Sequence, residues 1–189
     1  TALSLHDIGL KPRIYEQAKE MRPLGVGINL LPHAVRELSE LGLLNKLRST
    51  GVETDELRFY TQYGLEIQRE PRGTKAGYNW PQFSIHRGEL QMLLYEAVLE
   101  RIGSDCLKTN HTAADLQQNE AEVRVSFRDS LTKKNIKTDT ADIVIAADGI
   151  HSTIRKKYYP DEGSPIYAGI NLWRGTTWQK PFLSGQTMI

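Results

Sequence analysis

Cysteine is almost absent from this sequence. Cys106 is the only one in 189 residues, so no disulfide can form within the chain. Neither a second cysteine nor a spaced set of histidines accompanies it, so we predict a small buried thiol, a reducing compartment and no metal site. No apolar run approaches the roughly 20 residues of a membrane-spanning helix, and the N-terminal residues lack the basic segment of a secretory signal. We therefore expect a cytoplasmic protein without a membrane partner.

An excess of charge of either sign is also missing. The chain has 24 basic and 23 acidic residues, mixed along its length, and a formal net charge of +1. Such a balance offers no basic face to a nucleic acid. With 39% hydrophobic and 25% charged residues, the composition is typical of an ordinary globular domain with a core. We expect small molecules as partners, and no nucleic acid.

The N-terminal residues resemble the middle of a dinucleotide-binding unit. A helix of small and apolar residues over 1–8 is closed by Gly9, and the β-type run Lys11–Glu16 ends on an acid. In a βαβ unit such an acid binds a ribose about 20 residues after a G-x-G-x-x-G loop. Counting back from Glu16 puts that loop before Thr1, outside these residues. Taken alone, Glu16 is as readily a solvated charge at a strand end.

Two glycines and an arginine are the next candidates for a ligand site. Gly25 and Gly27 lie two residues apart in an apolar loop, where they either let the backbone approach a flat ligand or serve a tight turn. Arg87 opens the clearest helix of the sequence, which ends near Gly103. A helix dipole disfavours a cation at its N-terminus, so Arg87 indicates an anionic or hydrogen-bonding ligand.

Other segments predict the scaffold. We expect a helix from Pro32 to Gly42, a hairpin over 57–69 that turns at Tyr63-Gly64, a loop over 71–81 and a half-buried strand over 122–127.

The strongest signal is the stretch from Ala141 to Arg155. The apolar run Ile143–Ala147 predicts a parallel strand buried on both faces, ending at Asp148-Gly149, where open α/β sheets bind ligands. Ser152 can cap the following helix and leave backbone N–H groups aimed at an anion such as a pyrophosphate, with Arg155 one turn inside. The alternative is an ordinary strand-to-helix turn with an exposed aspartate.

These motifs together resemble a known family. The segment from Ala146 to Arg155 is similar to the DG motif of the class A flavoprotein aromatic hydroxylases, the family of p-hydroxybenzoate and salicylate hydroxylases. Glu16 resembles that family's ribose-binding acid, Gly25-Val26-Gly27-Ile28 its glycine loop near the flavin, and Arg87 its helix-start arginine. Residues 22–38 look especially like the bacterial phenazine-hydroxylase branch.

The resemblance implies a fold and a domain division. It implies an α/β, Rossmann-like FAD-binding domain over residues 1–160, doubly wound, with a mostly parallel sheet and an added hairpin or meander. Residues 161–189 would begin an α+β substrate-binding domain, with a first strand over 166–177 where Tyr167, Trp173 and Arg174 could face the substrate. The family's opening strand, its glycine-rich loop and its later Gly-Asp motif are missing, so we expect a fragment.

The resemblance also implies an activity. The intact protein would be an FAD-dependent monooxygenase that hydroxylates a small aromatic substrate with NAD(P)H and molecular oxygen. The cofactor carries the chemistry, so we expect binding residues here and no catalytic side chain. Glu16 would accept from the ribose, Gly25 and Gly27 would admit the flavin, Arg87 would donate to the cofactor, and Asp148-Gly149 would shape the approach of pyrophosphate and nicotinamide. The cofactor-binding residues it implies are Glu16, Gly25, Gly27, Arg87, Asp148, Gly149 and Arg155.

Two other interpretations stay open. The scaffold also suits another flavin oxidoreductase, such as a halogenase or a reductase, because a fold does not fix a reaction. Alternatively, the chain is a truncated module without catalysis. Loss of a central strand would expose apolar strand edges, so we expect the fragment to bind FAD poorly and to self-associate.

Overall fold

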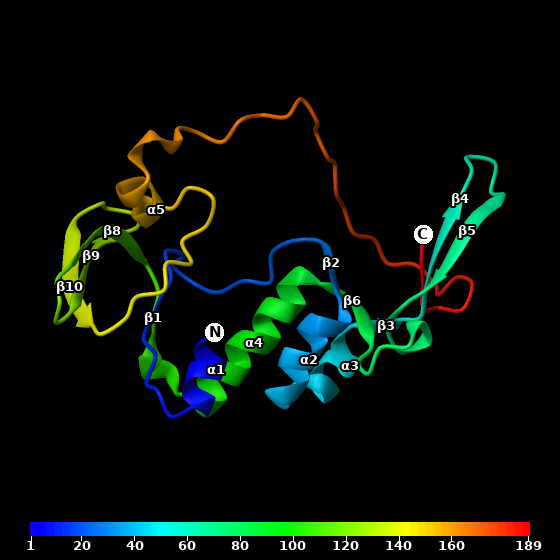
Figure 1. Ribbon diagram of the computed structural model, residues 1–189, viewed down its shortest axis with the longest axis horizontal. Coiled ribbons are helices and arrows are strands. Elements are labelled where there is room, and N and C mark those ends of the chain that lie inside the picture. The colour runs from blue at the N-terminus through cyan, green and yellow to red at the C-terminus, as the bar shows by residue number, and fades with distance from the viewer. The chain divides into compact units, whose positions relative to one another are not determined.

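The computed structural model describes all residues, Thr1–Ile189, and the chain divides into two compact units (Figure 1). Unit 1 consists of Thr1–Leu10, Arg22–Gly103 and Trp173–Ile189, and unit 2 of Lys11–Met21 and Ser104–Leu172. No helix in either unit has the length and apolar character to cross a bilayer. The predicted domain boundary at residue 160 stays a prediction.

Unit 1 is built on an antiparallel sheet of order β2-β6-β3, covered by helices. Its strands and helices are β2 (Gly27–Leu30), β3 (Val52–Thr54), β6 (Gln82–His86), α1 (Ala2–Asp7), α2 (Pro32–Glu40), α3 (Leu44–Thr50) and α4 (Arg87–Arg101). The centre of its core is formed by Val35, Leu47 and Phe83, one from α2, one from α3 and one from β6, and all three are fully buried. The predicted helices after Pro32 and Arg87 are confirmed, and α4 packs against α1 and α3.

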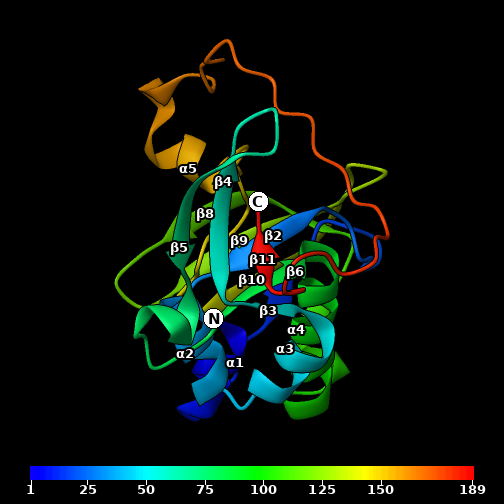
Figure 2. The ribbon, with the colours of Figure 1, turned by 90° about the vertical axis from the view of Figure 1, so that its right-hand side faces the viewer.

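The predicted hairpin is confirmed and has a third strand. β4 (Glu56–Tyr60) pairs antiparallel with β5 (Glu66–Pro71), and the short 3₁₀ helix η1 (Gly73–Ala76) follows in the predicted loop. β11 (Thr187–Met188) runs parallel to β4 on its other side, as Figure 2 shows. The last residues of the chain thus extend this small sheet.

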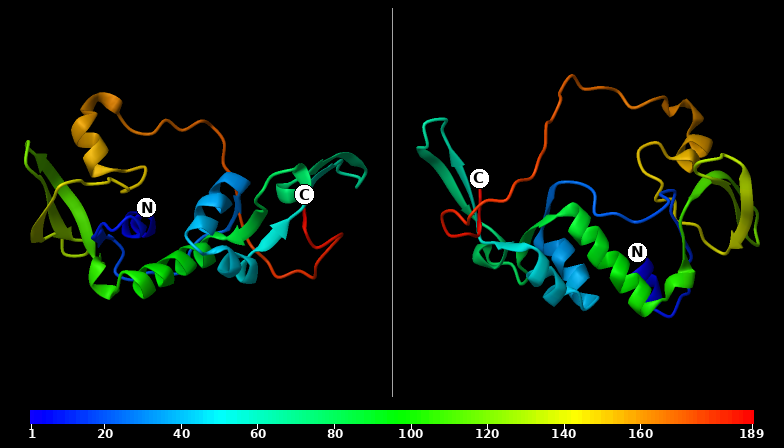
Figure 3. Two further views of the ribbon diagram at one scale, coloured as in Figure 1. Left: turned by 60° about the horizontal axis from the view of Figure 1, so that its bottom comes forward. Right: turned by 180° about the vertical axis from the view of Figure 1, so that it is seen from behind.

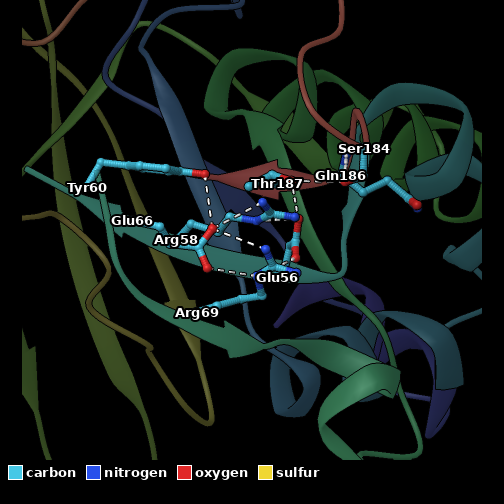
Figure 4. A network of polar contacts seen from close by, with 8 residues as sticks. All are labelled: Glu56, Arg58, Tyr60, Glu66, Arg69, Ser184, Gln186 and Thr187. Atoms are coloured by element: carbon cyan, nitrogen blue, oxygen red, sulfur yellow. Dashed lines mark hydrogen bonds and ion pairs between the residues drawn. The ribbon is translucent and has the colours of Figure 1, made fainter. Parts of the chain in front are cut away.

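A polar network holds β11 to the hairpin (Figure 4). Arg58 Nε donates to Glu56 Oε1 at 2.9 Å, and the same oxygen accepts from Thr187 Oγ1 at 2.5 Å. Glu66 receives hydrogen bonds from Arg58 and Arg69 at 3.3 and 3.1 Å. The hydrogen bond from Arg58, followed by that from Thr187, lowers the pKa of Glu56, so this carboxylate remains charged at neutral pH.

Unit 2 is an antiparallel meander with a short parallel strand pair. The pair is β1 (Ile14–Tyr15) with β7 (Leu107–Lys108), and the meander has the order β10-β9-β8. Its remaining elements are β8 (His111–Gln118), β9 (Val123–Asp129), β10 (Asn135–Ala141), α5 (Thr153–Tyr158), η2 (Ser104–Cys106) and η3 (Pro160–Glu162). Helix α5 packs on β8, where Ile154 joins a small core with Leu116, Val125 and Phe127 (Figure 1). The thiol of Cys106 is buried, as expected.

The predicted buried strand over Ile143–Ala147 does not form. These residues have no regular secondary structure, and the side chains of Ile143 and Ile145 are 77% and 55% exposed. A strand buried on both faces needs a paired neighbour on each side, and none of the 189 residues pairs with this run. Parallel pairing is limited to β1 with β7 and β11 with β4, and every other strand pair is antiparallel.

The predicted strand over residues 166–177 is also wrong for this structure. Residues 164–180 contain no helix or strand, and Figure 3 shows the segment as a continuous coil. Ile166 and Trp173 are 95% and 94% exposed, and Tyr167 is 66% exposed. The same physical reason applies, because no other segment of the chain pairs with this one through a ladder of backbone hydrogen bonds.

Candidate functional site

The sheet of unit 1 brings Gly25 next to Arg87. β2 and β6 pair with Gly27 opposite His86, so the residues before β2 meet the residue that follows β6. The backbone N–H of Arg87 donates to Val26 O at 2.9 Å. Gly25 has a φ of +130°, and a Cβ atom added there would lie 2.6 Å from Arg87 Nε. The positive φ favours glycine at this position, and a side chain there would also displace the Arg87 guanidinium.

Gly88 explains why the loop can lie so close to α4. A Cβ atom at Gly88 would be 2.4 Å from the carbonyl carbon of Pro23 and 2.7 Å from Leu24 N. The loop backbone therefore rests directly on the first turn of the helix. Gly88 was not among the predicted site residues, although a glycine directly after the helix-start arginine was a usable signal.

The charge of Arg87 is not balanced by a carboxylate. Arg87 is the first residue of α4, and no ion pair is formed by its guanidinium. The helix dipole at this end also repels a cation, so an anionic or electron-rich ligand would be stabilised here. Beside it, no atom lies within 4 Å of a Cβ position at Gly27, whose carbonyl accepts from Arg174 Nη2 at 2.8 Å. Unit 1 thus brings Gly25, Gly27 and Arg87 together around one surface.

In unit 2, Asp148 and Ser152 hold the N-terminus of α5. Ser152 Oγ accepts from Arg155 N at 2.9 Å, which confirms the predicted cap, and Asp148 Oδ2 accepts from Ile154 N at 3.3 Å. Burial would raise the pKa of Asp148, but its hydrogen bonds with the Ser152 side chain and the Ile154 backbone outweigh this and lower it. Two amides that we predicted to face an anion therefore already have partners within the protein.

Arg155 is likewise engaged within unit 2. Its Nη2 donates to Ile150 O at 2.6 Å, and its Nε lies 2.8 Å from Glu162 Oε2. Gly149 has a φ of +78°, a left-handed conformation that glycine adopts without strain. A cavity of about 470 Å³ lies beside these residues, and its lining includes Asp148, Gly149, Ser152, Arg155, Tyr158 and Tyr159.

Glu16 lies at the end of a strand, as predicted, although the strand is shorter than expected. Its backbone N–H donates to Lys108 O at 2.9 Å, and its carbonyl accepts from His111 N at 2.9 Å. One carboxylate oxygen, Oε1, accepts from Ala18 N at 2.7 Å. Glu16 shares no hydrogen bond or ion pair with the residues around α5, so unit 2 holds two separate groups of predicted site residues.

A family of known domains matches most of the chain. Residues 1–164 match the family described as the FAD binding domain. The phenazine 1,6-dicarboxylic acid hydroxylase PhzS of Lysobacter antibioticus is 41% identical over 190 residues, which is 100% of this chain and 47% of that protein. The 3-amino-4-hydroxybenzoate 2-monooxygenase of Streptomyces cremeus is 32% identical over 178 residues, which is 92% of this chain and 42% of that protein. The chain thus spans under half the length of these curated relatives.

Solved structures share the fold at lower identity. The p-nitrophenol 4-monooxygenase PnpA of Pseudomonas putida superposes with a TM-score of 0.73 at 19% identity, over 83% of this chain and 39% of that chain. Klebsiella pneumoniae HpxO, crystallised with FAD and uric acid, gives a TM-score of 0.67 at 22% identity, over 82% of this chain and 37% of that chain.

Proposed function

Because this chain belongs to the FAD-binding domain family, we propose that it provides the cofactor-binding part of an FAD-dependent monooxygenase. The resemblance to the class A flavoprotein monooxygenases is confirmed by the family match and by the phenazine hydroxylase relative. In this proposal the protein hydroxylates a small aromatic molecule and uses NAD(P)H and dioxygen. When bound, FAD would accept electrons from NAD(P)H and activate dioxygen.

The contact between Gly25 and Arg87 is the observation that carries the proposal. A guanidinium without a carboxylate partner lies against a backbone whose positive φ favours glycine, next to the open Cα of Gly27. This chemistry fits FAD, which offers a flat ring system and an anionic pyrophosphate. In the proposal, Gly25 and Gly27 admit the cofactor to the backbone, and Arg87 donates hydrogen bonds to it.

The predicted binding residues of unit 2 have separate roles in the proposal. The Glu16 carboxylate accepts hydrogen bonds from the adenosine ribose. Asp148-Gly149 shapes the approach of the pyrophosphate and the nicotinamide. Arg155 contributes mainly by holding the loop, since its guanidinium is bound to Ile150 O and Glu162.

The further assignments rest on the relatives and on composition. The phenazine 1,6-dicarboxylic acid hydroxylase is 41% identical, which supports a fused or substituted aromatic ring as the substrate class. We propose an FAD-binding domain over residues 1–160 and the start of a substrate-binding domain over 161–189. The buried, unpaired thiol of Cys106 supports a cytoplasmic location.

The test uses the protein expressed from the complete gene and loaded with FAD. Phenazine-1,6-dicarboxylate and 3-amino-4-hydroxybenzoate would each be incubated with NADH or NADPH and isotopically labelled dioxygen, and the products analysed by mass spectrometry. The proposal predicts a product that carries one labelled oxygen atom, formed in proportion to the NAD(P)H consumed. Oxidation of NAD(P)H without any labelled product from these or other aromatic substrates would contradict a monooxygenase and favour another flavin oxidoreductase.

A further inference from the structure

The strand that carries Glu16 is attached to the meander through one aspartate. Arg13 directly precedes β1 and Tyr15 ends it, and both side chains reach the same residue of β10. The hydroxyl of Tyr15 donates to Asp139 Oδ2 on β10, and Arg13 Nε lies 2.9 Å from the same oxygen. Arg13 also donates to the backbone carbonyl of Thr140. Asp139 therefore binds both side chains that flank Ile14.

The ring of Tyr15 also packs against other side chains of unit 2. It stacks on Phe127 with a centroid distance of 4.0 Å and an interplanar angle of 23°, and His111 lies beside it at 5.5 Å. Lys137 Nζ lies 5.5 Å from the ring centroid. Because Phe127 belongs to the buried core of unit 2, the packing of Tyr15 on Phe127 attaches β1 to that core.

Both ionisable groups keep the protonation state that this contact needs. Burial, and then the hydrogen bond to Asp139, raise the pKa of Tyr15, so its hydroxyl remains a donor at neutral pH. Burial alone would raise the pKa of Asp139, but the hydrogen bond from Tyr15 and the charges of Arg13 and Lys137 together lower it. The pair is thus a neutral donor and a charged acceptor, a strong type of hydrogen bond.

Backbone hydrogen bonds to Lys108 and His111 hold the main chain at Glu16, but the strand ladder beside it is short. β1 pairs with β7 over two residues, Ile14 with Leu107 and Tyr15 with Lys108. One oxygen of the Glu16 carboxylate is bound to Ala18 N, so the other oxygen must meet a ribose hydroxyl in a narrow range of orientations. A small rotation of β1 about its axis would move that oxygen out of reach.

We propose that Asp139 is a positioning residue for cofactor binding: it holds Arg13 and Tyr15, fixes β1, and so aims Glu16 at the ribose of the adenosine half of FAD. This inference rests on the proposed function. It assigns a role in cofactor affinity to a residue of the meander, 123 positions after Glu16 in the chain.

The experiment compares two ligands in the protein expressed from the complete gene and freed of FAD. Fluorescence titration would measure the affinity for FAD and for an FAD analogue that lacks both hydroxyls of the adenosine ribose. Asp139→Ala is expected to weaken FAD binding about tenfold, the size of one hydrogen bond to a charged group, and to leave the affinity for the analogue unchanged. Asp115→Ala removes an equal charge from the exposed pair of Asp115 with Lys157 in the same unit, and is expected to change neither affinity.

Two further variants separate the possible failures. Tyr15→Phe removes the hydrogen bond to Asp139 and keeps the stacked ring, so it should reproduce part of the loss for FAD even where Asp139→Ala folds poorly. Glu16→Gln, measured in parallel, tests the proposed function itself. The positioning role is wrong if Glu16→Gln weakens FAD binding while Asp139→Ala and Tyr15→Phe do not. It is also wrong if Asp139→Ala and Tyr15→Phe weaken the binding of FAD and of the analogue equally. If Glu16→Gln has no effect on FAD, the ribose-binding role of Glu16 in the proposed function is wrong as well.

Discussion

Two segments of this chain, Gln82–His86 and Ile143–Ala147, are each followed by a helix, and only the first is a strand. β6 lies between β2 and β3, and its Phe83 and Ile85 are 0% and 3% exposed. The run Ile143–Ala147 is the more apolar of the two, yet it has no strand partner, and Ile143 is 77% exposed. The helix after each run forms all the same. A helix is closed by local hydrogen bonds, whereas a strand exists only beside a neighbour.

The largest expected effect is that of truncating Phe83 in β6, compared with truncating Ile143 in the unpaired segment. Phe83→Ala should reduce the free energy of unfolding by about 3–5 kcal/mol, because it leaves a cavity in a fully buried core. Ile143→Ala should change it by less than about 0.5 kcal/mol, because that side chain is already exposed. Urea denaturation of the 189-residue chain measures both values. Equal losses would mean that Ile143 is buried in a partner strand after all.

Two glycines near Arg87 allow a similar comparison within unit 1, because a side chain at Gly25 meets other atoms and one at Gly27 does not. Gly25→Ala should cost about 1–2 kcal/mol in stability, because its φ of +130° disfavours a side chain and the new Cβ meets Arg87 Nε. Gly27→Ala meets no atom within 4 Å, so it should hardly change stability. If the proposed cofactor lies over Gly27, this second variant still loses FAD affinity. Thermal unfolding and FAD titration separate the two effects, and a Gly27→Ala protein with normal affinity would place the flavin elsewhere.

A smaller effect is expected at the cap of α5. Ser152→Ala should destabilise unit 2 by about 1 kcal/mol, because Arg155 N loses its acceptor. It should also bring the pKa of Asp148 back up, since the hydrogen bond with Ser152 helps to lower it. Because the pKa of this carboxylate is lowered in the folded state, it stabilises the fold above about pH 4, and this stabilisation is lost on further acidification. The free energy of unfolding of the variant should therefore depend less on pH in that range. Denaturation curves at several acidic pH values measure both effects. The control is Ser130→Ala, which removes a hydroxyl that is hydrogen-bonded to Thr112 in the same unit but lies outside the cap. A pH profile of Ser152→Ala that matches the wild type would contradict the role of the cap.

The smallest effect on folding is expected at the exposed residue Ile145. Ile145→Lys should leave the stability of the isolated chain within about 0.5 kcal/mol, because the side chain is 55% exposed. It should nevertheless reduce the self-association that we predict for this chain, since it places a charge on the unpaired apolar run. Light scattering of the eluting protein gives the mass of each species. A wild-type chain that stays monomeric at high concentration would contradict the prediction.

The sequence predicted the parts of the fold that local interactions decide. The helix after Arg87, the hairpin over 57–69 and the Ser152 cap are all present, because spacing, turn residues and capping side chains act over a few positions. The segments 143–147 and 166–177 were predicted as strands from their composition. Composition measures the tendency to be buried in a sheet, but it carries no information on whether a neighbouring strand is available.

Some residues of the candidate site were predictable from the sequence, whereas the long-range contacts that support them were not predicted. Gly25 and Arg87 were chosen for chemical reasons, and the structure brings them into contact. The crossing of the loop over Gly88 and the link from Asp139 to Tyr15 both join segments far apart in the sequence. The glycine after Arg87 is a local signal for the first, and no local pattern marks the second.

The most direct test of the account compares two arginines of α4 in the protein expressed from the complete gene. Arg87 begins the helix beside Gly25, and Arg101 ends it with a hydrogen bond to Leu41 O at 2.7 Å. FAD titration of Arg87→Ala should show at least about a tenfold loss of affinity, as expected for a charged hydrogen-bond donor to the cofactor, whereas Arg101→Ala should bind FAD like the wild type. Equal affinities in the two variants would contradict a cofactor site at the start of α4.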